Sequence, residues 1–406
     1  MKRYYKKLRV RSALMNLSVM ATVSLFTACG GGGGADTKTG FGGSGDPPPL
    51  TDALTAAGPL STVGVAGIAA TGVDDRVAPI FINTQAGQSF NALKLGMVAE
   101  VNGTIPANAV TATSGTATNI IVQSAVVGPV NSVDLANQRV VVLPLTVQVD
   151  QNTIFEGLNS LTSLSAGTRV EAYGLPQAES KTLLATRLIF LPAVAGAPLE
   201  LVGTATNVSA FQFTLQGVAV STATLTSVTT PAGVAAGTSS IVENARVRVL
   251  GNYSASTNSL APSQVVTGIP VTRNDNTIIV LDGIVQSVGV NGRFRLNDTE
   301  VETAATNAVT VGARVQAKGR KTAGVLVATD FRRIAVGERL QFVVQGDIAS
   351  VVSSANFRVR GESINAATAS FVGGTAADLV AGRVVRIKAE VNAGRLEATE
   401  VSFITG

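Results

Sequence analysis

One strand pattern recurs along the chain, and this recurrence limits the fold more than any other feature. Each copy has a turn residue, then alternating apolar and polar or small side chains, then a second turn residue. Clear copies lie at 95–103, 166–174 and 311–319, with weaker copies at 243–251 and 381–389. A period of two is the signature of a β-strand, and long apolar patterns with a period of 3.6 are absent. The chain is therefore predicted to be nearly all-β.

Two further signals accompany the copies. Hairpin patterns such as 357–361 precede the long strand, and a closing strand such as 183–190 follows it. Five strands in about 65 residues predict a small five-stranded barrel of the oligonucleotide-binding (OB) type. Each unit opens at a glycine, namely Gly67, Gly128, Gly203, Gly283 and Gly346.

The spacing of these signals predicts about five tandem units, each with its own core. The first and third units are degenerate. Asn244 replaces the central glycine of the third unit, and the closing strand of the first is a poor match around 119–122. The predicted repeats are 61–125, 126–192, 199–267, 278–334 and 341–404.

These landmarks resemble the bacterial repeat family known as domain of unknown function 5666. The resemblance covers most of the chain from Val63 to Phe403. Members of that family are commonly exported lipoproteins with tandem copies of the glycine-led strand. The resemblance implies an architecture and carries no established activity.

The first 28 residues are typical of a signal peptide. Six basic residues and no acidic residue precede an apolar run from Ala13 to Ala28, which ends directly before Cys29. The run is too short and too weakly apolar for a membrane span. Its end, Leu25-Phe26-Thr27-Ala28-Cys29-Gly30, resembles the lipobox of bacterial lipoproteins, although Leu25 stands one place early. An ordinary secretory signal with an incidental cysteine is the alternative.

The lipobox resemblance implies an address for the protein. In lipoproteins the cysteine sulfur receives a diacylglycerol, the peptide is cut before it, and the new amino end is acylated, for example with palmitate. Two or three acyl chains hold a protein stably at a bilayer. Gly30 after the cysteine implies the outer membrane of a Gram-negative host. Residues 29–60, rich in glycine and proline, are predicted to form a tether.

The apparent basicity of the chain comes from this leader. The whole chain has 31 basic and 26 acidic residues, but without the leader 25 basic residues face 26 acidic ones, a net charge of −1. A nucleic-acid-binding function therefore loses its support from bulk charge.

The residues that the chain lacks exclude most catalytic chemistry. It has no His and no Trp, and its one Cys is Cys29. Serine–histidine and cysteine–histidine nucleophiles are excluded, as is ordinary zinc, copper or haem ligation. No catalytic residue, metal or cofactor is predicted. Carboxylate catalysis, a serine–lysine pair and calcium binding through oxygen ligands stay open.

Basic residues at strand positions that are predicted to face outward suggest an anion-binding surface in the last two repeats. From Leu201 onward the net charge is +4, whereas from Gly30 to Glu200 it is −5. Such a surface could dock a polyanion such as lipopolysaccharide. The alternative is that outward strand positions are simply charged, which also blunts edge pairing. The candidate residues are Arg293, Arg295, Arg314, Lys318, Arg358, Arg360, Arg386 and Lys388.

Three carboxylates share one strand face by their spacing, Asp298, Glu300 and Glu302. They could line a calcium site or form an acid–base pair, but a solvated charged face is the favoured interpretation. Asp74 and Asp75 are interpreted as a turn.

Together these features predict a non-enzymatic, lipid-anchored envelope protein that acts as a multivalent interaction or structural module. Its expected partners are the membrane, through the lipid anchor, and an envelope protein or anionic polymer. The alternative is a polyanion- or small-ligand-binding module that uses repeats 4 and 5. A carboxylate-based hydrolase is the remote alternative.

Overall fold

The computed structural model describes residues 51–64, 67–69, 81–84, 93–106, 114–179, 181–194, 196–223, 225, 227–230, 233–267, 274–290, 292–305 and 309–404. The predicted signal peptide, Cys29, the glycine tract and the turn at Asp74 lie outside these residues. The described part is strand and turn, with short 3-10 turns, so the all-β prediction is confirmed. Within it, no helix has the length and hydropathy that a membrane span requires.

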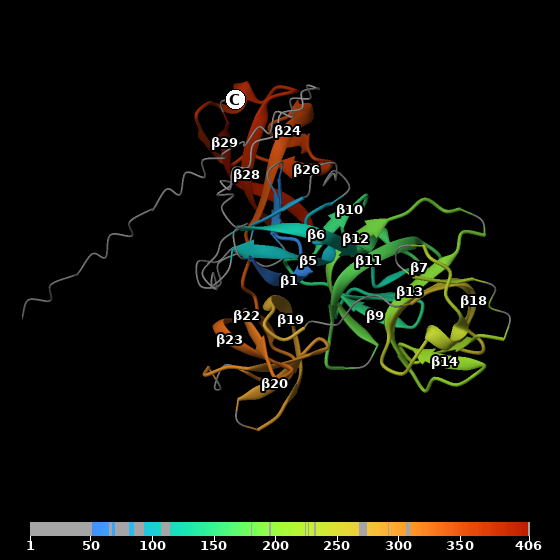
Figure 1. Ribbon diagram of the computed structural model, residues 1–406. Helices are drawn as coiled ribbons and strands as arrows, with labels where there is room; N and C mark the ends of the chain where they lie inside the picture. The colour runs from blue at the N-terminus through green and yellow to red at the C-terminus, as the bar shows by residue number, and fades with distance from the viewer. Residues whose placement is uncertain are drawn as a thin grey trace, which may run out of the picture. The chain divides into compact units, whose positions relative to one another are not determined.

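The second repeat shows how one barrel closes (Figure 1). Strands β7, β8 and β9 form an antiparallel meander, and β9 then pairs in parallel with β12. Strand β11 pairs with β12 on one side and returns to β7 on the other. This closed order is that of the predicted OB-like barrel. The strands are β7 (Val126–Asp134), β8 (Arg139–Val142), β9 (Leu145–Gln148), β11 (Arg169–Pro176) and β12 (Thr182–Phe190).

Short elements lie between the third and fourth barrel strands. In the second repeat these are β10 (Ile154–Glu156), which runs parallel to β12, and the 3-10 turn η1 (Leu161–Ser163). The third repeat has β16 (Val228–Thr229) and η2 (Thr238–Ser240) at this point. The fifth has β27 (Ser370–Val372) and η4 (Ala376–Asp378).

The same pairing order recurs in the later repeats. The third closes through β13–β14–β15–β18–β17, the fourth through β19–β20–β21–β23–β22, and the fifth through β24–β25–β26–β29–β28. Their strands are β13 (Leu199–Thr206), β14 (Gln212–Leu215), β15 (Val218–Ser221), β17 (Arg246–Ser254), β18 (Ser259–Val266), β19 (Ile278–Val288), β20 (Arg293–Leu296), β21 (Thr299–Glu302), β22 (Arg314–Thr322), β23 (Val325–Arg333), β24 (Phe342–Ser353), β25 (Asn356–Val359), β26 (Glu362–Asn365), β28 (Val384–Asn392) and β29 (Arg395–Phe403).

The first repeat begins earlier than its sequence indicated. Residues 51–59, assigned above to the tether, form β1, which pairs with β5 along its whole length. The first barrel strand is thus split into β1 and β2, and the tether prediction is wrong beyond residue 50. The difference arises because Leu54 and Ala56 lie on one face of this strand and are both buried in a core. The strands are β1 (Thr51–Pro59), β2 (Thr62–Gly64), β3 (Gly67–Ala69), β4 (Phe81–Thr84), β5 (Val98–Pro106) and β6 (Ser114–Val122).

The barrels do not keep five separate cores. The buried apolar residues gather into three clusters, so three cored bodies replace the predicted five. One cluster joins the first and fifth repeats, a second joins the second and third, and the last belongs mainly to the fourth. A barrel of about 65 residues buries only about 60% of its unfolded surface, so shared cores add the burial that one repeat lacks.

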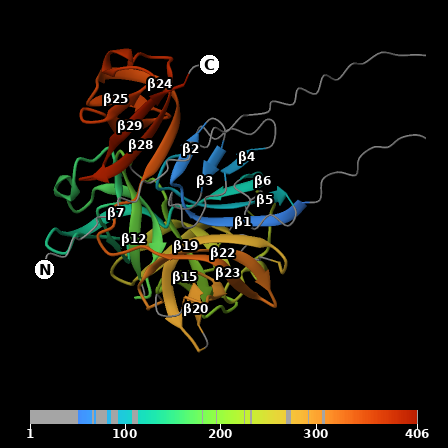
Figure 2. The same ribbon diagram turned by 90° about the vertical axis from the view of Figure 1, so that its left-hand side faces the viewer.

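Main-chain pairing between first strands joins the repeats. Strand β1 runs parallel to β19, with Leu54 opposite Ile278 and Ala57 opposite Leu281 (Figure 2). Strand β2 pairs with β24, and β7 pairs with β13. The first repeat is therefore joined by hydrogen bonds to the fourth and the fifth, although both are far away in sequence.

Candidate functional site

A buried guanidinium stands at the junction of the first, second and fifth repeats. Arg187 on β12 is 1% exposed and contacts carboxylates from two repeats. Its Nη2 atom lies 2.5 Å from an oxygen of Glu156 on β10, and its Nη1 atom lies 3.0 Å from an oxygen of Glu362 on β26. One side chain thus bridges the second and fifth repeats.

The first repeat supplies the remaining partners of this cluster. Arg187 Nη1 donates to the carbonyl of Leu95 at 2.7 Å, and the Leu95 amide donates to Glu362 at 2.8 Å. Lys94 forms an ion pair with Glu156. Thr186 also donates its hydroxyl to the Gly96 carbonyl at 2.6 Å. The segment before β5 is therefore fixed to the second barrel by charge-assisted bonds, which are stronger than neutral ones.

We name Lys94, Glu156, Arg187 and Glu362 the junction cluster. Burial disfavours the charge of Arg187, but Glu362 and Glu156 outweigh this effect and raise its pKa. Burial likewise raises the pKa of Glu156, and Arg187 and Lys94 more than compensate, so the net shift is downward. The cluster combines two basic and two acidic side chains, so its formal charges cancel. Its groups hold each other in place and are unsuited to proton transfer.

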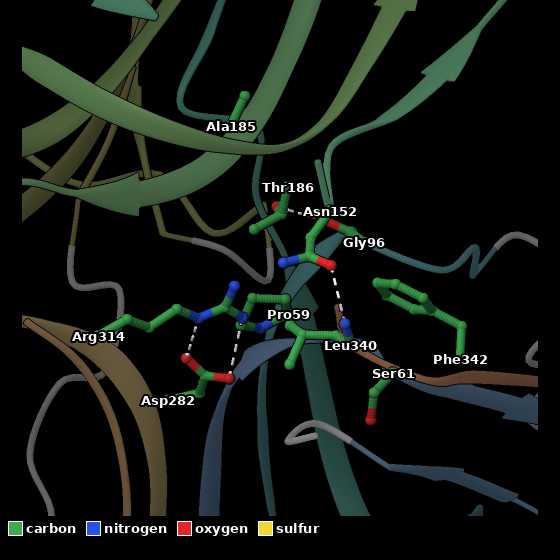
Figure 3. A pocket seen from close by; sticks show the side chains of 10 residues that line it. All are labelled: Pro59, Ser61, Gly96, Asn152, Ala185, Thr186, Asp282, Arg314, Leu340 and Phe342. Carbon is green, nitrogen blue, oxygen red and sulfur yellow. Dashed lines mark hydrogen bonds and ion pairs between the residues drawn. The ribbon is translucent and has the colours of Figure 1, made fainter. Parts of the chain in front are cut away.

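A second ion pair lies at the border of the fourth repeat (Figure 3). Arg314 on β22 makes a bidentate contact with Asp282 on β19, at 2.9 and 3.0 Å. Gln316 donates to the same carboxylate at 2.9 Å. Beside the pair is a cavity of about 10 Å³, which has room for about one water molecule. Pro59, Gly96, Thr186 and Phe342 also line it, so three further repeats meet the fourth there.

The link between the fourth and fifth repeats is held on the second barrel. Asn152 donates to the Glu338 carbonyl at 2.8 Å and accepts from the Leu340 amide at 2.8 Å. Gln151 also donates to the Glu338 carbonyl, at 3.1 Å. Both residues lie in the turn before β10, so this contact and the junction cluster fix the same part of the second repeat.

Two of the eight predicted anion-binding residues do not face solvent. The prediction that Arg314 and Lys318 point outward into water is wrong. Arg314 is nearly buried by its contact with Asp282, and Lys318 is 1% exposed. Burial lowers the pKa of Lys318, with Asp330 acting against this effect. At Arg314 the physical reason is that residues of three other repeats line the same small cavity and replace solvent there.

The other six residues are exposed or half-buried, and two of them are paired with acids. Arg293 contacts Glu302 at 3.0 Å and Glu300 at 3.6 Å, and Lys388 contacts Glu400 at 3.1 Å. Arg295 donates to the Asn297 carbonyl at 3.3 Å. Arg358 and Arg386 are exposed on the fifth barrel, and Arg360 is half-buried at the turn after β25.

Asp298, Glu300 and Glu302, the three carboxylates at and before β21, are exposed or half-buried on one face of the strand. Glu300 and Glu302 share Arg293 as a partner, and Asp298 precedes them at the turn. Within the described ranges, no group of three or more Asp, Glu, His or Cys residues could hold a metal ion. These contacts favour the solvated-face interpretation over a calcium site.

No pattern in the sequence indicated the junction cluster. By a period of two Arg187 shares the face of Leu183 and Ala185, which join the barrel core, and only the β-bulge between Ala185 and Arg187 shifts the arginine out of that core. Its partner Glu362 lies 175 residues later, two positions after Arg360, which was predicted to be exposed. Only the packing of separate repeats brings the two together.

A known protein family matches two of these barrels. The family described as Domain of unknown function (DUF5666) matches residues 127–188 and 345–402. The first match spans β7 to β12 and the second lies within β24 to β29, so the two best-preserved copies belong to the second and fifth repeats. No curated protein matches the chain.

Proposed function

We propose that this chain, two of whose repeats match the DUF5666 family model, is a non-enzymatic envelope protein, lipid-anchored at Cys29, that presents its barrels as a rigid scaffold. The observation that carries the proposal is the junction cluster. Buried charge pairs that need three repeats at once favour a fixed arrangement of barrels over beads on a string. A fixed array presents several weak binding surfaces together, which raises the effective concentration of each.

The site chemistry agrees with a structural role. The carboxylates that are brought together at repeat borders, Glu156, Glu362 and Asp282, are all engaged with arginines. The cavity beside Asp282 has room for about one water molecule, which is too small for a substrate. The hydrolase alternative required two carboxylates in a deep pocket, and this cavity gives it no support.

The amino-terminal sequence supports the proposed location. The basic leader, the apolar run and Cys29 followed by five glycines are the features of a lipoprotein amino terminus. Residues 30–50 then separate Cys29 from β1, and their glycine and proline content is that of the tether predicted from the sequence. We propose that the scaffold is held at the outer membrane of a Gram-negative cell on this tether.

Replacing the cysteine tests the anchor and the role together. We expect the wild-type chain, produced with its own leader, to fractionate with outer membranes and its amino-terminal peptide to carry the mass of a diacylglycerol and an acyl chain. Cys29→Ser should move the protein to the soluble fraction and abolish cross-links to envelope components in intact cells. Equal distribution of the two proteins, or an unmodified cysteine in the wild type, would overturn the proposal.

A polyanion-binding function is the second candidate, because Arg358 and Arg386 are exposed on the fifth barrel. We expect Arg358→Glu with Arg386→Glu to abolish salt-sensitive binding to lipopolysaccharide, since each cation that meets a phosphate adds to the salt dependence. Arg293→Glu is the matched control, because Glu300 and Glu302 already neutralise that arginine. Binding that is unchanged in the double variant rejects this candidate.

A further inference from the structure

The third repeat has a pocket that the scaffold function does not use. Its volume is about 270 Å³, and it lies between the β13–β14 hairpin and the turn η2. Phe213 lies at the floor of this pocket and belongs to strand β14, which is labelled in Figure 1. Phe213 and Ile241 are 1% and 4% exposed and form the apolar base. Val208 and Ala210 also line the pocket, together with four hydroxyl side chains, Ser209, Thr222, Thr238 and Ser239.

The second repeat explains why the space is open. Leu161 and Thr238 are both the first residue of the 3-10 turn, and each stands three residues before a buried aliphatic side chain, Leu164 or Ile241. Leu161 is 4% exposed and packs in the shared core, whereas η2 contributes no buried residue. In the third repeat Thr238 stands where the second repeat has Leu161, so the buried side chain that fills this space in the second repeat is missing in the third. The pocket is therefore a local change on a conserved barrel plan.

The lining has hydrogen-bonding capacity and no charge. Thr222 donates to the Ala210 carbonyl at 3.1 Å, which leaves its hydroxyl oxygen as an acceptor. Ser209 donates to the Gln212 carbonyl at 3.0 Å and accepts from the Gln212 amide at 3.3 Å, so its hydroxyl is largely engaged within the hairpin. The side chains of Thr238 and Ser239 have no partner among the described residues and can both donate and accept. Among the described residues that line the pocket, none has an ionisable side chain. A charged ligand would lose its hydration here without gaining a counter-ion.

We propose that the third repeat binds an uncharged, hydroxyl-bearing molecule of monosaccharide size. The carbon face of a sugar ring packs on Val208 and Ala210, the apolar lining residues that stay accessible, and its hydroxyls meet those of Thr238 and Ser239. The volume lies just below the range usual for drug-sized ligands, which suits one sugar unit. Phe211, 73% exposed on the same hairpin, offers a further apolar face outside the pocket for a neighbouring unit.

Refilling the pocket tests the site. The probes are glucose, galactose and N-acetylglucosamine, with glucose 6-phosphate as the charged counterpart, measured on the full chain by ligand-observed NMR. We expect at least one neutral sugar to bind the wild type. Thr238→Leu copies the plug of the second repeat and should weaken that binding by about tenfold or more. Circular dichroism checks that the variant is folded.

The control makes the same substitution outside the pocket. Thr162 is exposed in η1 of the second repeat, so Thr162→Leu should leave sugar binding unchanged. The proposal is overturned if no neutral sugar binds the wild type, or if Thr238→Leu binds as the wild type does. Tighter binding of the phosphorylated sugar than of glucose would overturn the assignment of an uncharged ligand.

Discussion

Arg187→Met is expected to lower the apparent free energy of unfolding by about 3–5 kcal/mol, the typical effect of removing one partner from a buried ion pair. Methionine keeps the aliphatic stem of Arg187 but cannot hydrogen-bond to Glu362, whose side chain is 4% exposed. That carboxylate would retain the Leu95 amide as a partner and lose its counter-charge. Urea denaturation followed by circular dichroism measures the change.

An exposed ion pair supplies the control for this experiment. Lys388→Met breaks the contact with Glu400, in which both side chains are about one-third exposed. The expected loss is below about 1 kcal/mol, because solvent screens such pairs. Equal effects of the two substitutions would show that Arg187 is not buried between the repeats in solution.

Acid sensitivity gives a second readout of the junction cluster. The folded pKa of Glu156 lies below its usual value because Arg187 and Lys94 outweigh its desolvation. A lowered folded pKa stabilises the fold above the unfolded pKa, and this contribution is lost as the pH falls through the folded pKa. The wild type should therefore lose more stability between neutral and acidic pH than Arg187→Met does.

The barrels could be predicted from sequence because their determinants are local. The alternation in 166–174 and 311–319 places apolar side chains inward whatever surrounds the barrel. The opening glycines also have a local reason: a Cβ atom on Gly128 would lie 2.7 Å from the side chain of Leu143, which packs over that strand. Strand identity and closure follow from neighbours within one repeat.

The environment of the outer faces could not be predicted in this way. A period of two separates inward from outward positions, but it cannot show whether solvent or another repeat covers an outward one. Lys318 and Arg358 have the same phase in the sequence, and one is buried while the other is exposed. The two cores that join different repeats and the junction cluster depend on contacts between distant parts of the chain, since Arg187 and Glu362 lie 175 residues apart.

The pocket of the third repeat is an intermediate case. Its signal is one residue, Thr238 where the second repeat has Leu161, and the copies can be aligned at Gly167 and Asn244. The difference acquires meaning only once the structure shows that Leu161 fills the space beneath the hairpin.

Asp282→Leu is expected to destabilise the protein by about 3–5 kcal/mol, as Arg187→Met does, because it leaves the buried guanidinium of Arg314 without a counter-charge. Arg314 is 10% exposed and would lose both of its contacts with Asp282. Burial lowers the pKa of Arg314 and Asp282 raises it more, so the carboxylate is what keeps the guanidinium charge tolerable there. Thermal and urea unfolding measure the loss.

Restoring stability without the charges separates this cause from simple damage to the strand. Asp282→Leu with Arg314→Met should still be impaired, because Gln316 is fully buried and its amide would lose the Asp282 acceptor. Adding Gln316→Leu removes that last orphaned group, and the triple variant should recover to within about 1 kcal/mol of the wild type, since apolar replacements of buried ion pairs are commonly neutral or stabilising. A triple variant as unstable as Asp282→Leu would mean that the strand at 282 needs the carboxylate itself, and a stable Asp282→Leu would mean that Arg314 reaches water when the repeats separate.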